Sequence, residues 1–276
     1  MGTDVLVDVD AGVAVLTLNR PEHLNAYTAD MGTLLSRAHR HCDEDDDVRA
    51  IVVTGAGGAF CAGADFSGSA SPFDTRADDA AFSASPIDPP AFELRKPVIA
   101  AVNGHAIGIG LTIALQADVR IVAEDAKYGV VQVRRGVIPD CMSHWTLAHL
   151  TNLGVAAEVL LTGRTFDGAE AVALGVANKA LPPAQVLDCA MEMARDIATN
   201  VAPMSAALCK RLLWDSAING YTPRQVASLE TQLHHRVMGT DDAREGVAAF
   251  LDRRPPRFSS RLSADWTPLP EPEPEA

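Results

Sequence analysis

The chain has 276 residues, of which 47% are hydrophobic and only 5% aromatic, so it can bury a large aliphatic core as one domain, or as one domain with a helical extension. Its net charge of −13 argues against a nucleic-acid backbone or an anionic membrane surface as a partner, because both favour Lys and Arg. The five cysteines include no Cys-x-x-Cys pair, which favours reduced thiols. The N-terminus does not resemble a signal peptide, and no apolar run is long enough to cross a membrane, so we expect a soluble cytoplasmic protein.

The first elements of the chain are predicted to be strands and one helix. Residues 5–10 and 13–19 alternate in polarity on either side of a short turn, which is typical of a β-hairpin. Thr28 is suited to cap a helix whose apolar residues recur at helical spacing. Residues 48–54 form a further apolar run that leads directly into a glycine-rich loop at 55–65. The pattern therefore predicts a glycine-rich backbone segment immediately after a buried strand.

A long segment rich in Ser, Ala, Asp and Pro occupies residues 66–92 and shows no sustained hydrophobic period. We expect a mobile loop with one helical turn at 77–82. Long irregular insertions in a compact domain are more often functional or disordered than structural. The segment is therefore a candidate for substrate specificity.

The stretch from 96 to 118 predicts a strand that turns sharply into a helix. It begins with an apolar run, a polar turn interrupts the run, and residues 107–117 are small and apolar. Gly108 and Gly110 flank Ile109 at the start of this helix, where backbone N–H groups without intrahelical partners favour an anion or a developing oxyanion. The alternative is a tight turn that serves only helix–strand packing.

The second half of the chain changes from mixed to purely helical. We expect a strand at 118–123, an extended piece at 126–133 and a turn at 134–140. Helices are expected at 143–150, 155–161, 167–174, 184–199, 203–219, 223–238 and 241–253. Strand–helix alternation before the last helices indicates a stacked α/β core. The Pro- and Glu-rich residues 262–276 have too little apolar surface to bury, so we expect them to be disordered.

Ordered motifs extend from the first hairpin to the last long helix: 18–26 (LNRPEHLNA), 59–65 (AFCAGAD), 96–104 (KPVIAAVNG), 161–166 (LTGRTF), 171–176 (AVALGV), 241–246 (DDAREG) and 250–258 (FLDRRPPRF). Taken together they resemble the crotonase family, also called the enoyl-CoA hydratase/isomerase superfamily. The resemblance implies an α/β fold, the ClpP/crotonase-like spiral of ββα units, over residues 1–199. It also implies a C-terminal helical trimerisation region at 200–260, and residues 261–276 remain as the expected disordered tail.

The chemistry implied by the resemblance takes place beside a CoA thioester. Removing a proton from the carbon next to the thioester, or adding water to a 2-enoyl thioester, places negative charge on the carbonyl oxygen, and two preorganised N–H donors stabilise it. Matching to the family assigns these donors to the backbone of Ala64 and Ile109. Ile109 replaces the family's usual glycine, but a backbone N–H remains if the isoleucine tolerates the local φ and ψ.

The acid–base residues differ from those of the type hydratase. Where that enzyme has two glutamates that hold and activate water, this chain has Thr112 and Gln132, and neither is a general base at neutral pH. Asp140 stands where isomerase branches of the family carry a catalytic Asp or Glu. One carboxylate suffices to move a proton between two carbons of an enolate, and an apolar pocket that raises its pKa would favour this. The alternative is that Asp140 makes a turn or caps the helix near Ser143.

Further site residues follow from the resemblance. His144 is expected one helical turn after Asp140, where it would orient the carboxylate or carry a second proton; the alternative is a surface or packing histidine. Neutralisation of the CoA phosphates is expected from Arg20, or from Arg253, Arg254 and Arg257. The other implied substrate contacts are His23, Ala26, Ala62, Asp65, Phe66, Gly110, Thr112 and Gln132.

The sequence therefore predicts an acyl-CoA enzyme that isomerises 3-enoyl-CoA to 2-enoyl-CoA, with Asp140 as its single acid and base. Two alternatives remain open: a 2-enoyl-CoA hydratase, and a non-catalytic acyl-CoA-binding protein. No metal or redox cofactor is expected, since coenzyme A is part of the substrate. The resemblance implies a homotrimer or a dimer of trimers, with no nucleic-acid or membrane partner.

Overall fold

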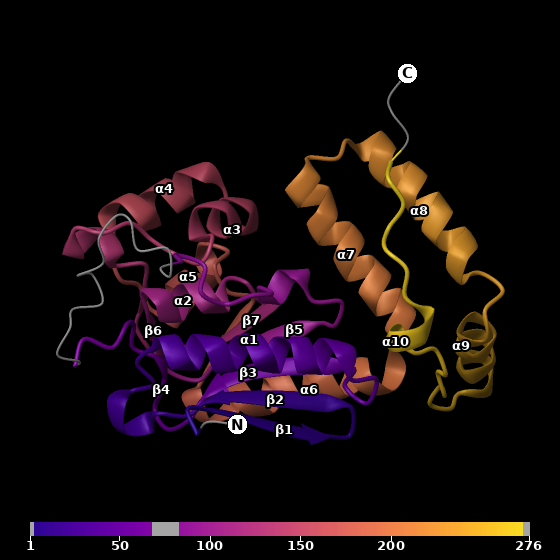
Figure 1. Ribbon diagram of the computed structural model, residues 1–276, viewed down its shortest axis with the longest axis horizontal. Coiled ribbons are helices and arrows are strands. Elements are labelled where there is room, and N and C mark those ends of the chain that lie inside the picture. Colours follow the sequence, from indigo (N-terminus) through magenta and orange to yellow (C-terminus); the bar gives the residue numbers. More distant parts are fainter. Residues whose placement is uncertain (1–2, 68–82, 273–276) are drawn as a thin grey trace.

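The computed structural model describes residues 3–67 and 83–272 (Figure 1). The helical turn predicted at 77–82 lies outside these residues. The centre is a six-stranded sheet in the order β1-β2-β3-β5-β7-β9, in which β1 is antiparallel to β2 and the other neighbours are parallel. Its strands are β1 (Val5–Asp10), β2 (Val13–Leu18), β3 (Ala50–Gly55), β5 (Val98–Val102), β7 (Val119–Ala123) and β9 (Lys179–Leu181). The predicted N-terminal hairpin is confirmed.

A second sheet of three parallel strands consists of β4 (Ala59–Cys61), β6 (His105–Ile107) and β8 (Tyr128–Gly129). Consecutive strands alternate between the two sheets, so that β3 leads to β4, β5 to β6, and β7 to β8. Each turn of the chain therefore adds one strand to both sheets, which is the predicted spiral. At the corner between β5 and β6, the Asn103 amide donates hydrogen bonds to the carbonyl oxygens of Gly55 and Gly57, both at 2.9 Å.

The helices of the core lie mostly where the sequence pattern predicts them. They are α1 (Ala29–Glu44), α2 (Ile109–Ala114), α3 (Ser143–Leu150), α4 (Leu153–Thr162), α5 (Gly168–Ala173) and α6 (Pro183–Asn200). Thr28 caps α1 as predicted, since its side chain accepts a 3.1 Å hydrogen bond from the Met31 N–H. Helix α2 is shorter than expected at both ends. Ile107 still belongs to β6, and after Ala114 the N–H groups of Gln116 and Ala117 donate to the carbonyl oxygens of Ile113 and Ala114 in turns. Residues Gln132–Arg135 form a 3-10 helix, so the extended piece predicted at 126–133 is wrong at its end.

Three long helices follow the core: α7 (Pro203–Asn219), α8 (Pro223–Val237) and α9 (Asp241–Asp252). They extend to one side of the sheet in Figure 1. A small apolar core of its own joins α7 and α8 to the C-terminal segment that contains Leu262. The buried Lys210 of α7 attaches them to the first part of the chain. Its ammonium group lies 2.7 Å from the Asp118 carboxylate and donates to the carbonyl oxygens of Ala91 and Lys96 at 2.8 and 2.9 Å. Within the described ranges, no helix has the length and apolar character needed to cross a bilayer.

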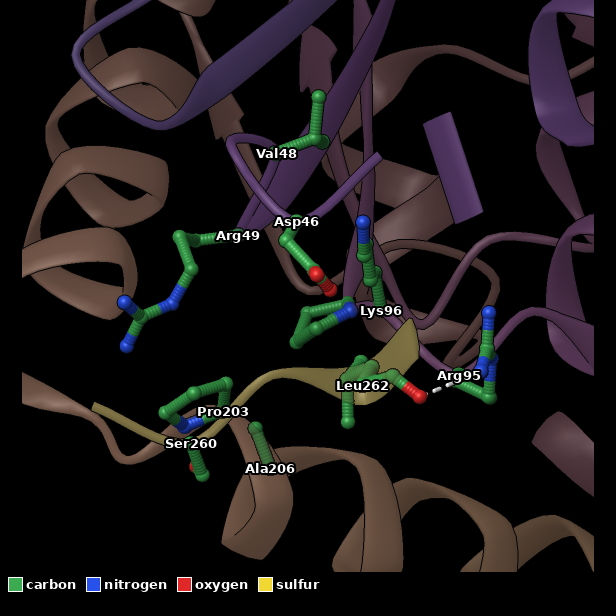
Figure 2. A pocket seen from close by; sticks show the side chains of 10 residues that line it. Asp46, Val48, Arg49, Arg95, Lys96, Pro203, Ala206, Ser260 and Leu262 are labelled. Carbon is green, nitrogen blue, oxygen red and sulfur yellow. Dashed lines mark hydrogen bonds between the residues drawn. The ribbon is translucent and has the colours of Figure 1, made fainter. Parts of the chain in front are cut away.

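The C-terminal segment differs from the disordered tail expected at 261–276. Residues Leu262–Asp265 form the short helix α10, and Leu262 is only 5% exposed. Figure 2 shows Leu262 beside Arg95, which donates a 3.2 Å hydrogen bond to the Leu262 carbonyl oxygen. The Arg95 guanidinium also lies 5.9 Å from the ring centroid of Trp266. The expectation is therefore wrong for this part of the segment, because the average composition hid two apolar side chains that pack against the protein.

Candidate active site

Two glycine-bearing loops leave neighbouring strands at the same edge of the small sheet. Strands β4 and β6 pair in parallel, with Cys61 opposite Ala106, so the loops that follow them begin side by side. Gly63 and Gly108 have φ values of +111° and +56°, a region that favours glycine. Gly110 lies so close to the Cys61 carbonyl oxygen that a Cβ atom has no room there. The structure brings these two loops into contact.

Ala64 and Ile109 each present a backbone N–H without an acceptor in the described parts of the chain. The Tyr27 N–H donates to the Gly63 carbonyl oxygen at 2.7 Å, and the Asp65 N–H donates to the Tyr27 carbonyl oxygen at 2.9 Å. Ala64 lies between these two bonds, so its N–H points away from Tyr27. Ile109 is the first residue of α2, where an intrahelical acceptor is lacking. Gly108 takes the positive φ, so the isoleucine is accommodated without backbone strain.

Asp140 is held by two side chains from separate elements. Its Oδ1 accepts hydrogen bonds from Thr112 Oγ1 of α2 at 2.6 Å and from Gln132 Nε2 of the 3-10 helix at 3.2 Å. Burial raises the pKa of Asp140 above its ordinary value, although the two hydrogen bonds act in the opposite direction. Thr112 and Gln132 were predicted only as substrate contacts. Their positions as donors to Asp140 depend on tertiary structure and had no signal in the local sequence.

The backbone after Asp140 is unusual. Cys141 and Met142 have φ values of +49° and +58°, which is uncommon for residues other than glycine and typical of functional sites. The Cys141 N–H donates to the Ala84 carbonyl oxygen at 2.8 Å, and its own carbonyl oxygen accepts from Gln116 Nε2 at 3.3 Å. The C-terminal part of the 66–92 segment therefore contacts the residue after Asp140 through Ala84. The Asp140 side chain does not cap α3, since no side chain caps this helix and the carboxylate instead faces Thr112.

His144 and Cys141 lie close to Asp140 in the sequence, but the structure does not support a catalytic role for either side chain. His144 is exposed on α3, and the hydrogen bonds to the Asp140 carboxylate come from Thr112 and Gln132. The structure therefore gives no support to His144 as the residue that orients the carboxylate. Cys141 is fully buried, and burial raises the pKa of its thiol well above the ordinary value. The protonated thiol is a poor nucleophile.

The expected CoA contacts lie around the start of α1 and the loop after β4. Arg20 donates to the Ala26 carbonyl oxygen at 2.6 Å and pairs with Asp65 at 2.8 Å. Hydrogen bonds from Ser67 and Arg20 hold the pKa of Asp65 well below its usual range. Arg20 and Asp65 thus connect two segments to each other, and Arg20 is not a free cation for a phosphate group. Arg254 is likewise paired with both carboxylate oxygens of Glu245.

The other predicted contacts differ in exposure. His23 and Phe66 are exposed, Ala62 is half-buried and Gly110 is buried. The Ala62 N–H is already engaged, because it donates to the Leu24 carbonyl oxygen at 3.0 Å.

Comparison with known proteins identifies the family of the chain. A family model described as enoyl-CoA hydratase/isomerase matches residues 8–261. The chain belongs to this family. A probable enoyl-CoA hydratase of Mycobacterium bovis is 35% identical over 260 residues, which cover 93% of this chain and 98% of the relative. The 1,2-epoxyphenylacetyl-CoA isomerase of Escherichia coli is 33% identical over 267 residues, with the same coverage of 93% and 98%.

Solved structures of the enoyl-CoA hydratase/isomerase family share the fold. The crystal structure of a probable enoyl-CoA hydratase/isomerase from Mycobacterium abscessus has a TM-score of 0.90 and 53% sequence identity, and the match covers 94% of this chain and 100% of that one. The protein is thus a crotonase-fold enzyme of the enoyl-CoA hydratase or isomerase type. Because relatives are named as enoyl-CoA hydratases and as a 1,2-epoxyphenylacetyl-CoA isomerase, the residues of the site have to distinguish the reactions.

Proposed function

We propose that this protein isomerises 3-enoyl-CoA to 2-enoyl-CoA, with Asp140 as the single acid and base. The observation that carries the proposal is the Asp140 carboxylate, which has a raised pKa and is anchored to α2, the helix that begins with the free Ile109 N–H. Asp140 takes a proton from C2 of the acyl group, and the resulting charge spreads onto the thioester oxygen. The same carboxyl group then returns a proton at C4, so the double bond moves from C3 to C2.

The backbone N–H groups of Ala64 and Ile109 are the proposed oxyanion donors. Each stabilises charge that develops on the thioester oxygen, and the loss of one such donor costs roughly 3 kcal/mol in comparable enzymes. Thr112 and Gln132 keep the carboxylate oriented. This mechanism needs only one carboxylate, which agrees with the absence of glutamate at positions 112 and 132.

Exchange of the C2 protons with deuterated solvent tests the proposal. Asp140→Asn should slow exchange by about 100-fold or more, since a positioned general base contributes roughly 10²- to 10⁴-fold. His144→Asn is the matched control, because His144 is exposed nearby, and it should exchange at the wild-type rate. Unchanged exchange in Asp140→Asn would refute the role of this residue. Acyl-CoA binding without any exchange in the wild type would instead identify a non-catalytic acyl-CoA-binding protein.

A second candidate reaction is the hydration of 2-enoyl-CoA. Several relatives are named as hydratases, and Gln132 Oε1 is buried without a hydrogen-bond partner among the described residues, although the same amide donates to Asp140. This oxygen is able to accept a hydrogen bond from a water molecule beside the carboxylate. Formation of 3-hydroxyacyl-CoA from a 2-enoyl-CoA faster than isomerisation of the 3-enoyl isomer would favour the hydratase.

We further propose that the chain assembles as a homotrimer or a dimer of trimers. Val247, Phe250 and Leu251 of α9 are 62%, 82% and 72% exposed, and their spacing places them on one helix face. An apolar face of this kind is typical of a contact surface. Light scattering should give a trimer or hexamer mass for the wild type and a smaller mass for Phe250→Asp. A monomeric wild type would contradict the proposal.

A further inference from the structure

Tyr27 has a buried hydroxyl group that makes no hydrogen bond within the described chain. The residue is 9% exposed, and its Oη atom is inaccessible and lacks a partner. Tyr128, the other strongly buried tyrosine, shows the usual arrangement, since its hydroxyl donates to the Ala123 carbonyl oxygen at 2.7 Å. A buried hydroxyl group without a hydrogen-bond partner lowers the stability of the folded state by about 1 to 3 kcal/mol. Native proteins rarely keep such a group unless a water molecule or a ligand satisfies it.

The position of the Tyr27 hydroxyl is set by the elements that form the candidate active site. Its backbone pairs directly with the loop that carries Ala64. Its ring extends over Gly32 in the first turn of α1, where any side chain would overlap the phenol oxygen. The Pro86 carbonyl oxygen lies beside the same space. Gly32 therefore leaves room for this hydroxyl group.

The surroundings of the hydroxyl keep it a neutral donor close to the catalytic carboxylate. Burial raises the pKa of Tyr27 well above its ordinary value, and the neighbouring Cys141 and Asp140 raise it further. A phenol in this environment does not act as a base. It remains protonated at every working pH, and it can donate to an oxygen atom that arrives with the ligand.

We propose that Tyr27 is a specificity-determining residue whose hydroxyl donates a hydrogen bond to an oxygen atom on the acyl group bound beside Asp140. The preferred substrates are then CoA thioesters whose acyl chain carries a hydroxyl or carbonyl group, and a plain hydrocarbon chain leaves the phenol unpaired. This inference rests on the proposed function only in taking acyl-CoA as the ligand. It does not depend on which reaction Asp140 performs.

Binding measurements separate this inference from the reaction itself. Calorimetry compares hexanoyl-CoA with its derivatives that carry a hydroxyl or oxo group at successive carbons of the chain. The wild type should bind at least one oxygenated ligand more tightly, and Tyr27→Phe should reduce that preference by about threefold to tenfold while its affinity for hexanoyl-CoA stays the same. Tyr128→Phe is the matched control, because it removes a buried phenol oxygen elsewhere, and it should keep the wild-type preference.

Thermal unfolding of the two variants gives a second criterion. Tyr27→Phe removes an unpaired group, so its midpoint should equal or exceed that of the wild type, whereas Tyr128→Phe loses a hydrogen bond and should unfold at a lower temperature. Three results would each overturn the inference. The first is that Tyr27→Phe loses equal affinity for plain and for oxygenated ligands, and the second is that the wild type shows no preference between them. The third is a lower unfolding midpoint for Tyr27→Phe than for the wild type. Loss of exchange in Asp140→Asn does not bear on it.

Discussion

The hydrogen bond from Thr112 to Asp140 predicts a measurable pH dependence. Thr112 Oγ1 lies 2.6 Å from Asp140 Oδ1 and 3.2 Å from the Ile109 carbonyl oxygen, so the single hydroxyl proton is assigned to the carboxylate. A hydrogen bond to a charged group contributes about 1.5 to 3 kcal/mol, and one pKa unit corresponds to about 1.4 kcal/mol. Thr112→Val keeps the side-chain volume and removes the donor. It should therefore raise the pKa of Asp140 by about one to two units.

The effect should appear in the pH profile of C2 proton exchange. Burial already raises the pKa of Asp140, and its ionised form is the proposed base. Exchange therefore increases as the pH rises through this pKa, and in Thr112→Val the increase should move to higher pH by about one to two units. Mass spectrometry of the acyl-CoA in deuterated buffer measures the profile. Thr112→Ser restores the hydroxyl and should restore the wild-type curve. A Thr112→Val profile that superimposes on that of the wild type would refute the reasoning.

Three further predictions concern stability. Because folding raises the pKa of Asp140, its negative charge destabilises the folded state relative to the unfolded state above that pKa. Asp140→Asn should therefore raise the unfolding midpoint at about pH 8. This gain should disappear below about pH 4, where the carboxyl group of the wild type is protonated in both the folded and the unfolded state. Lys210→Met leaves the Asp118 carboxylate without its buried partner and should lower the free energy of unfolding by about 3 to 5 kcal/mol, measured in urea. Leu262→Ala should lower it by about 2 to 5 kcal/mol, and an unchanged value would mean that α10 does not pack in solution.

The parts of the fold that depend on local pattern could be predicted from the sequence. A buried apolar run followed by glycine and a small-residue helix is sufficient to place α2 and the Ile109 N–H, because strand length and helix starts are local properties. The N-cap at Thr28 is local in the same sense. The boundaries of α7 were predicted to the residue, since a proline begins this helix and a glycine follows it.

Contacts between distant segments could not be predicted in this way. Thr112, Gln132 and Asp140 come from three elements, and only their approach in space shows that two of them serve the third. Tyr27 had no distinguishing signal, because its orphan hydroxyl depends on the absence of a side chain at Gly32. The C-terminal segment was misjudged for a different reason: its mean composition is that of a disordered chain, but single apolar side chains decide whether it packs.

The buried ammonium group of Lys210 also constrains how the molecule moves. It connects α7 to the Asp118 carboxylate and to two carbonyl oxygens in separate stretches of the core. These three contacts oppose a hinge between α7 and the core, so we expect the scattering profiles of the free and the loaded protein to coincide.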